Sequence, residues 1–315
     1  TQENFLGKGQ RVNINTQLGG VNRIMISFTE PRFRDTKWST GVYLYNLERW
    51  YEDFDSTSTG GNLRFGHPMG EYSRFNFGYE YEVVDISNVD NDASLEIIEQ
   101  EGETTVGALT AGISRNTLDS RFTPRMGSLA SFTSKFAGLG GDADFFTLIA
   151  SAAKYFPLPW DCAFMVRGTI GYSEGIGGDD VPIFEKFFLG GLDSLRGFED
   201  RTVGPQERRG DYSPFIEDPD DYDVVGGEKQ LFFNFEYIFP ILKEAGIRGV
   251  VFFDTGNAYR SNEDYFSDMR KSAGFGVRWQ SPFGPLRLEM GFNLDPKSEY
   301  DESSSEFHFT MGSMF

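Results

Sequence analysis

The stretch that decides the fold is Tyr72-Ser73-Arg74-Phe75-Asn76-Phe77-Gly78-Tyr79-Glu80-Tyr81-Glu82. Every second residue from Phe75 to Tyr81 is aromatic, and the residues between them are polar or glycine. Successive side chains of a β-strand point to opposite faces, so this period of two places the aromatic residues on one face. A face so rich in Phe and Tyr suits lipid and its interfaces. The core of a soluble β-sandwich would more often contain Val, Ile and Leu.

The same alternation recurs along the whole chain. Arg23 to Thr29, Gln230 to Ile238 and Pro285 to Phe292 are the clearest further examples, and Arg287 and Glu289 fall on the polar face of the last one. About fourteen such segments are counted, and they begin near Arg11, Arg23, Ser39, Asn62, Tyr72, Thr104, Gly127, Phe145, Cys162, Gln230, Ile247, Ser272, Pro285 and Glu306. The sequence therefore predicts an all-β fold, a transmembrane antiparallel β-barrel, with a soluble sandwich as the alternative.

The composition fits a barrel, although it resembles that of a soluble acidic protein. The 315 residues have a mean hydropathy of −0.40 and a formal net charge of −19, and no apolar run approaches the roughly 18 residues of a membrane helix. A barrel wall exposes only every second side chain to lipid, so its mean hydropathy stays low. The charge argues against nucleic acid as a partner. With a lone Cys162 and two histidines, His67 and His308, no disulfide, metal site or other cofactor is expected.

The connections between the predicted strands alternate in kind. Some are short or compact and contain proline, which cannot donate to a ladder and favours tight reversals. The others are long and mostly acidic, with predicted ranges Arg49 to Gly61, Asp85 to Glu103, Glu174 to Lys229, Tyr259 to Lys271 and Asn293 to Ser305. Short turns at one rim and long loops at the other are typical of outer-membrane barrels, whose turns lie in the periplasm. Both termini are therefore expected on the periplasmic side.

Two acidic segments carry much of the negative charge. Asp85 to Glu103 contains seven acidic residues and no Lys or Arg, and Glu217 to Asp223 contains five acidic residues. Both are expected to be solvated external loops, with contact to divalent cations or lipopolysaccharide as the alternative.

The chain ends in a predicted strand, Glu306 to Phe315. The residues on its lipid face are Phe307, Phe309, Met311 and Phe315. This alternation, with an aromatic last residue, resembles the C-terminal signal by which bacterial outer-membrane proteins are recognised for assembly, although a plain last strand would also explain it. His308 is expected to face inward.

The longest connection contains a stretch that is unsuited to a strand, Gly190-Gly191-Leu192-Asp193-Ser194-Leu195-Arg196-Gly197-Phe198. An arginine next to glycines, followed by a phenylalanine, suits a loop that folds back and buries one cation. A barrel lumen can hold such a loop.

Within it, Leu195-Arg196-Gly197-Phe198 resembles the (V/L)RGF motif in loop six of the BamA-like barrels of the outer-membrane protein assembly and translocation (bacterial surface antigen) superfamily. Further matches occur in order at Asn4 to Gly9, Phe28 to Pro31, Phe188 to Gly191, Val203 to Pro205, Phe253 to Asn257 and Ser281 to Leu286. The resemblance extends over the whole chain. It implies a barrel of about sixteen strands in the full family, in which loop six folds into the lumen.

The resemblance also implies that Arg196 pairs with two lumenal carboxylates, Glu236 and Asp254. The alternation agrees for Glu236, because it lies opposite the aromatic face of its strand. A buried guanidinium needs such partners, since its desolvation is otherwise uncompensated. Gly197 is expected to let the backbone approach the wall and Phe198 to pack as an anchor. Whether this cluster only holds the loop or also controls a gate stays open.

Residues 1–315 are expected to form a single barrel domain, with 174–229 as the long extracellular loop that carries the motif. The soluble periplasmic POTRA repeats of the family are not recognised in the sequence, and its first β-hairpin would precede the match at Asn4 to Gly9. The chain is therefore expected to lack both. Accessory outer-membrane lipoproteins are accordingly expected to dock mostly outside it.

The function that the resemblance implies is that of the barrel core of an insertase. It would fold and insert other β-barrels by templating strands at a lateral seam between its first and last strands, and by thinning the bilayer. Its partners would be unfolded outer-membrane β-barrel proteins, lipids and lipopolysaccharide. The alternatives are a polypeptide translocation pore of the two-partner or autotransporter-assembly type, and a passive channel. An enzyme is disfavoured because no Ser/His/Asp set is evident, with His67 on a predicted turn and His308 on the last strand.

Overall fold

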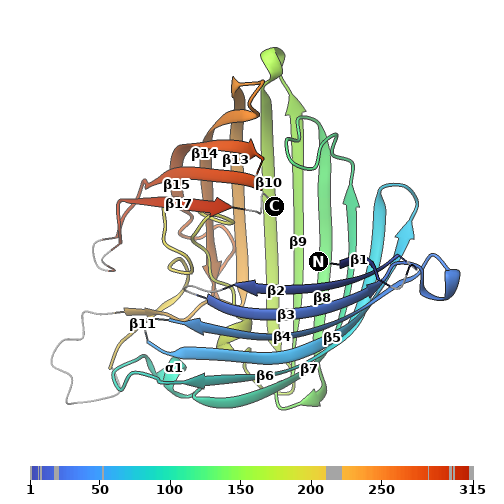
Figure 1. The fold of residues 1–315 in the computed structure, drawn as a ribbon. Coiled ribbons are helices and arrows are strands. Elements are labelled where there is room, and N and C mark those ends of the chain that lie inside the picture. Colours follow the sequence, from blue (N-terminus) through green and yellow to red (C-terminus); the bar gives the residue numbers. More distant parts are fainter. Residues whose placement is uncertain are drawn as a thin grey trace.

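The computed structural model describes residues 2–5, 7, 9–17, 21–51, 53–210, 222–282, 284–297, 300 and 302–311. In this part of the chain, fifteen strands form one antiparallel sheet and follow one another in chain order (Figure 1). Their bounds are β1 (Gln2–Phe5), β2 (Gln10–Gln17), β3 (Val21–Glu30), β4 (Ser39–Trp50), β5 (Asp55–Met69), β6 (Ser73–Ser87), β7 (Gly102–Asn116), β8 (Gly127–Gly141), β9 (Phe145–Pro157), β10 (Ala163–Gly175), β13 (Lys229–Leu242), β14 (Ile247–Tyr259), β15 (Arg270–Ser281), β16 (Gly284–Asn293) and β17 (Ser305–Met311).

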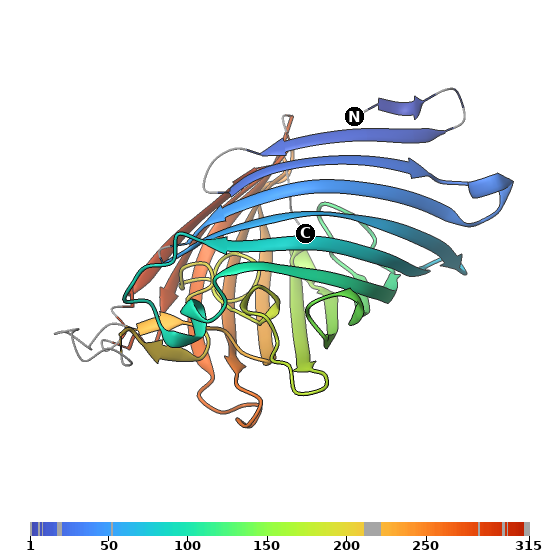
Figure 2. The same ribbon diagram turned by 90° about the horizontal axis from the view of Figure 1, so that it is seen from below.

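The sheet curls around an interior instead of lying flat (Figures 1 and 2). We use the name loop six for the connection between β10 and β13, residues 176–228. It contains the 3₁₀ helix η3 (Ile183–Glu185) and a separate two-stranded sheet of β11 (Gln206–Arg208) and β12 (Tyr222–Val224). Its motif, Leu195 to Phe198, is buried against the inner face of the wall.

The two faces of the wall differ as the alternation predicts. In β6 the aromatic side chains of Phe77, Tyr79 and Tyr81 are exposed on the outside, whereas the carboxylate of Glu82 is buried. An outer face of this kind suits contact with lipid.

The largest hydrophobic cluster inside the sheet joins loop six to the wall. It contains Phe187, Leu189, Leu195, Phe198, Val203, Phe232 and Ala258. Because most of these residues belong to loop six, burial of apolar surface holds the loop inside before any charge is considered.

The predicted strands agree with the structure in fourteen cases, β2 to β10 and β13 to β17. The short β1 was missed because its four residues show no alternation; it pairs with β2. The prediction of a loop from Arg49 to Gly61 was wrong, because β4 continues to Trp50 and β5 already begins at Asp55. Residues 56–61 are small and polar, so they lack an apolar face, yet their backbone pairs with both neighbouring strands.

The acidic segment Asp85 to Glu103 is more folded than a solvated loop. Its two ends belong to β6 and β7, and the short helix α1 (Leu95–Ile98) lies between them. Ala93 and Ile97 are buried in a cluster with Ile86 and Ile183. The prediction of a solvated external loop holds for Asp90, Asp92 and Glu99, which are exposed, but not for Ala93 and Ile97, which cover part of the interior.

The second acidic segment, Glu217 to Asp223, lies mostly outside the described residues. Asp223 is described and buried, and it accepts a hydrogen bond from the backbone N–H of Ser94 at 2.5 Å.

The remaining helical segments are short. They are η1 (Phe33–Asp35) and η2 (Pro159–Asp161), both in connections between strands. No helix in the described ranges is long and apolar enough to cross a membrane. His67, which was expected on a turn, lies in β5, where its ring is 4.7 Å from that of Trp38.

The last strand has the faces that the sequence predicts. Phe307, Phe309 and Met311 of β17 are each at least 60% exposed and point outward. Phe315 lies outside the described residues. In the described strand order β17 pairs with β16 and ends the sheet.

Candidate functional site

Loop six forms a compact turn that presents Arg196 to the wall. Leu189 and Val203 exchange two backbone hydrogen bonds of 2.8 and 2.9 Å across the base of the turn. The Ser194 hydroxyl accepts a hydrogen bond from the N–H of Gly190 and donates one to its carbonyl oxygen, at 2.8 and 2.7 Å. These bonds fix the backbone on both sides of the motif, so the position of Arg196 does not depend on the wall alone.

The guanidinium of Arg196 is 1% exposed and contacts three carboxylates. Its Nε and Nη2 donate to the two oxygens of Asp254 at 2.7 and 2.6 Å, which is a bidentate pair. Its Nη1 donates to Glu236 at 2.6 Å and to Glu289 at 2.9 Å. The centre of the Phe252 ring lies 3.7 Å from the guanidinium carbon. The site therefore binds the cation by charge, by planar hydrogen bonding and by cation–π contact.

Two further arginines on the wall complete the network. Arg278 of β15 donates to both oxygens of Glu236, at 2.7 and 2.8 Å, and to Glu289 at 2.8 Å. Arg287 of β16 donates to both oxygens of Glu289, at 2.8 and 3.1 Å. Three guanidinium groups thus meet three carboxylates, and the formal charges cancel.

This balance explains how six charged groups can be buried together. Removal of an ion from water is costly unless a well-placed opposite charge and hydrogen bonds replace the water. Each carboxylate here accepts from at least one arginine, and Asp254 also accepts from the backbone N–H of Arg196 at 3.1 Å. The side-chain amide of Asn234 bridges loop and wall, since it donates to Asp254 at 2.8 Å and to the carbonyl of Ser194 at 2.6 Å.

Gly197 brings the backbone of loop six onto the backbone of β16. It has φ +97°, and a Cβ on it would lie 3.0 Å from backbone atoms of Phe292. A Cβ on Gly291 would lie only 2.3 Å from the nitrogen of Gly197. No larger residue fits at either position without movement of the loop, because both contacts are with backbone. Phe198 is buried in the hydrophobic cluster, as expected.

The motif also reaches the last strand. The backbone N–H of Gly197 donates to Nε2 of His308 on β17, at 3.4 Å. His308 is opposite Glu289 in the register of β16 and β17, and its inward direction agrees with the alternation.

A second ionic contact holds loop six to a different part of the wall. Glu185 of η3 pairs with Lys135 of β8 at 2.7 Å. Lys135 also contacts Glu80 and Glu82 of β6, at 3.0 and 3.4 Å. Loop six therefore contributes an anion at this contact and a cation at Arg196.

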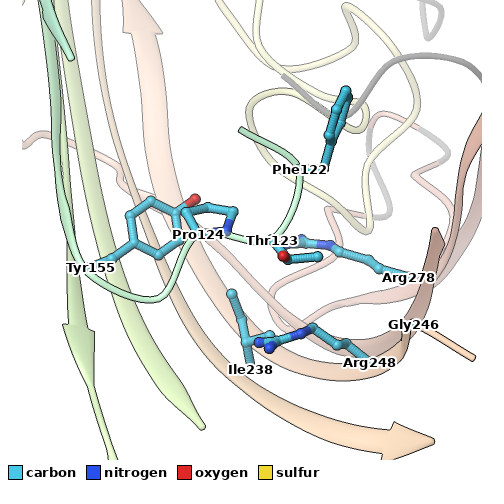
Figure 3. A pocket seen from close by; sticks show the side chains of 8 residues that line it. All are labelled: Phe122, Thr123, Pro124, Tyr155, Ile238, Gly246, Arg248 and Arg278. Atoms are coloured by element: carbon cyan, nitrogen blue, oxygen red, sulfur yellow. The ribbon is translucent and has the colours of Figure 1, made fainter. Parts of the chain in front are cut away.

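A small cavity lies beside the Arg196 network. Figure 3 shows the connection between β7 and β8 approaching the facing wall, with Thr123 close to Arg278. The cavity is lined by Phe122, Thr123, Pro124, Tyr155, Ile238, Gly246, Arg248 and Arg278. Its volume of about 20 Å³ suits a single water molecule. Within the described residues, no group of three or more His, Cys, Asp and Glu side chains could hold a metal ion.

The structure places both expected partners, Glu236 and Asp254, on Arg196. Sequence reasoning did not identify Glu289, Arg278 or Arg287 as part of the same centre. The alternation in Pro285 to Phe292 already places Arg287 and Glu289 on the inner face. Alternation does not say, however, which inward residues of distant strands meet.

The chain belongs to the Omp85 superfamily, since the Omp85 superfamily domain matches residues 4–315. The outer membrane protein assembly factor BamA of Nitratidesulfovibrio vulgaris is 33% identical over 319 residues, which cover the whole of this chain and 39% of that protein. BamA of Neisseria meningitidis is 27% identical over 367 residues, which cover the whole of this chain and 44% of that protein. The human sorting and assembly machinery component 50 homolog is 25% identical over 66% of this chain and 45% of its own length. The chain thus spans about two fifths of these curated relatives.

Solved structures show the same fold. BamA from Haemophilus ducreyi lacking POTRA domains 1–3 aligns with a TM-score of 0.85 at 22% identity, over 97% of this chain and 65% of that one. CdiB from Escherichia coli aligns with a TM-score of 0.65 at 13% identity, over 98% of this chain and 57% of that one. The prediction of a BamA-like β-barrel is therefore confirmed.

Proposed function

We propose that this chain forms the barrel core of an insertase that folds and inserts β-barrel proteins into the outer membrane. The observation that carries the proposal is the position of the Arg196 network. It fixes loop six to the strands β13 to β16, directly beside β17, which ends the described sheet. The relatives named outer membrane protein assembly factor support the same assignment.

The proposed mechanism uses the edge of the sheet as a template. A strand at an edge presents unpaired backbone N–H and C=O groups, and an incoming strand can pair with them. Unpaired backbone groups are not tolerated in lipid, so pairing the substrate during entry lowers the barrier to insertion. The mechanism requires no covalent chemistry.

The proposed mechanism also includes local thinning of the bilayer beside the seam. A wall shorter than the bilayer thins the membrane next to it, which would assist insertion at that place.

In this proposal the barrel lies in the bacterial outer membrane, with both termini in the periplasm. Its substrates are unfolded β-barrel proteins, and lipids and lipopolysaccharide surround it. Accessory lipoproteins would act mostly through periplasmic domains of the full-length protein.

The test is depletion of the full-length protein in cells, followed by a census of outer-membrane proteins. A general loss of β-barrels is expected. Unchanged amounts of other barrels would refute the proposal.

A polypeptide translocation pore of the same superfamily is the second candidate, and the structural likeness to CdiB favours it. In that case depletion would remove a single exported protein, and the isolated protein would conduct ions in planar bilayers. A passive channel would conduct without any dedicated exported partner.

A further inference from the structure

His308 accepts a hydrogen bond that joins the motif of loop six to the last strand. Its ring faces the interior from β17, while its neighbours Phe307 and Phe309 face outward. Nε2 accepts a hydrogen bond from the N–H of Gly197, so the imidazole is neutral there, with its proton on Nδ1.

The contact occurs where loop six cannot shift easily. Arg196 is held by three carboxylates, and the next residue, Gly197, is packed against the backbone of Gly291 on β16. The N–H of Gly197 therefore points from a fixed backbone toward β17. Glu289, which binds Arg196, is also the residue opposite His308 in the ladder.

Among the described residues, the hydrogen bond to His308 is a polar contact on the inner face of β17. In the described sheet β17 forms one ladder, with β16, over seven register pairs. Its outward side chains are at least 60% exposed, so they supply little packing within the described part of the chain. A polar contact on the inner face is thus placed where it can set the tilt and position of the strand.

We infer that His308 is a positioning residue through which loop six holds β17 at the edge of the sheet. This inference rests on the proposed function in one respect: the strand that is held is the one that would template a substrate. The coupling itself is a property of the fold and can be measured without any substrate.

The experiment compares His308→Leu, which removes the acceptor, with His308→Gln, which retains an acceptor at a similar distance along the side chain. Thr310→Val is the matched control, because Thr310 is the next inward-facing residue of β17. Amide hydrogen exchange is measured in the full-length protein in lipid nanodiscs, for the peptides that contain Gly197 and Phe307 to Met311.

We expect His308→Leu to speed exchange in both peptides about fivefold, the factor that corresponds to one ordinary hydrogen bond. His308→Gln should stay near the wild type, and Thr310→Val should leave the Gly197 peptide unchanged. Unchanged exchange in His308→Leu, or equal acceleration in Thr310→Val, would overturn the inference.

Assembly of a test β-barrel by the same variants in proteoliposomes separates this inference from the proposed function. If His308→Leu accelerates exchange and reduces assembly while His308→Gln does neither, the inference about His308 and the proposed function are both supported. If the wild type assembles nothing but exchange responds as expected, the proposed function fails and the coupling stands.

Discussion

Two of the ionic contacts of loop six, at Arg196 and at Lys135, differ in balance and in burial. At Arg196, three guanidinium groups meet three carboxylates, and the side chains are between 0 and 12% exposed. At Lys135, one ammonium group meets Glu80, Glu82 and Glu185, and the side chains are between 11 and 18% exposed. The first is balanced in formal charge and on average more deeply buried, whereas the second carries two excess formal negative charges.

The comparison indicates that the contact at Arg196 holds loop six firmly in place, whereas the contact at Lys135 holds it less firmly. Arginine offers five donors in a planar fork, which can satisfy several carboxylates at defined angles. Lysine is a point charge with a flexible stem, so it tolerates an unbalanced group that retains some water. Loop six should therefore loosen at Lys135 long before it loosens at Arg196.

Arg196→Ala should have the largest effect. It leaves the carboxylate of Asp254 buried without its bidentate partner, and loss of one member of a buried ion pair costs on the order of 3–5 kcal/mol. We expect a lower unfolding temperature in heat-modifiability gels and weaker assembly of other barrels. Arg167→Ala is the control, since Arg167 is an inward arginine that donates to the carbonyl of Asp193 at 3.2 Å and lies over the ring of Phe232, with no carboxylate among these two partners. An Arg196→Ala protein with full heat stability would show that the network does not hold the loop.

Asp254→Asn should have the next largest effect. The amide keeps the shape of the side chain but places an NH₂ group against a guanidinium donor, so one charged hydrogen bond is lost. This loss should lower the free energy of unfolding by about 1.5–3 kcal/mol. Limited proteolysis should cut loop six faster than in the wild type. The exposed Asp200→Asn serves as the control. If the loop stays protected in Asp254→Asn, Asp254 is not needed as the counter-ion.

Lys135→Met should destabilise less, because the carboxylates around it keep 11 to 18% of their side-chain surface exposed and can recruit water. Proteolysis near Glu185 should increase while the motif around Arg196 stays protected. Lys154→Met, an exposed lysine on β9, is the control. Equal loss of protection at both places would contradict the idea of two independent contacts.

Glu185→Gln should have the smallest effect. Burial, together with the nearby Glu82 and Glu80, raises the pKa of the Glu185 carboxyl, although Lys135 acts to lower it. The folded state then binds the proton more tightly than the unfolded state, so the contribution of this group to stability falls as pH rises between the unfolded and the folded pKa. Mild acidification should stabilise the wild type slightly, and Glu185→Gln should lose this response. Melting curves at neutral and mildly acidic pH measure this response. An identical pH response in the variant would show that Glu185 is not its source.

The sequence by itself determined the strands and their faces. The period of two is a local property of each segment, and it placed Glu236, Arg287, Glu289 and His308 on the inner face without any knowledge of the neighbours. The resemblance to the family added the pairing of Arg196 with Glu236 and Asp254. Where the period is absent, as in the four residues of β1 and the small polar residues 56–61, the strands were missed.

Only the tertiary structure decided which inward residues meet. Arg196 is 93 residues from Glu289, and Gly197 is 111 residues from His308. Their contact depends on how many strands separate them, on the stagger between strands and on how far the sheet curls. These quantities are fixed by the whole ladder of hydrogen bonds together, so no single stretch of sequence contains them.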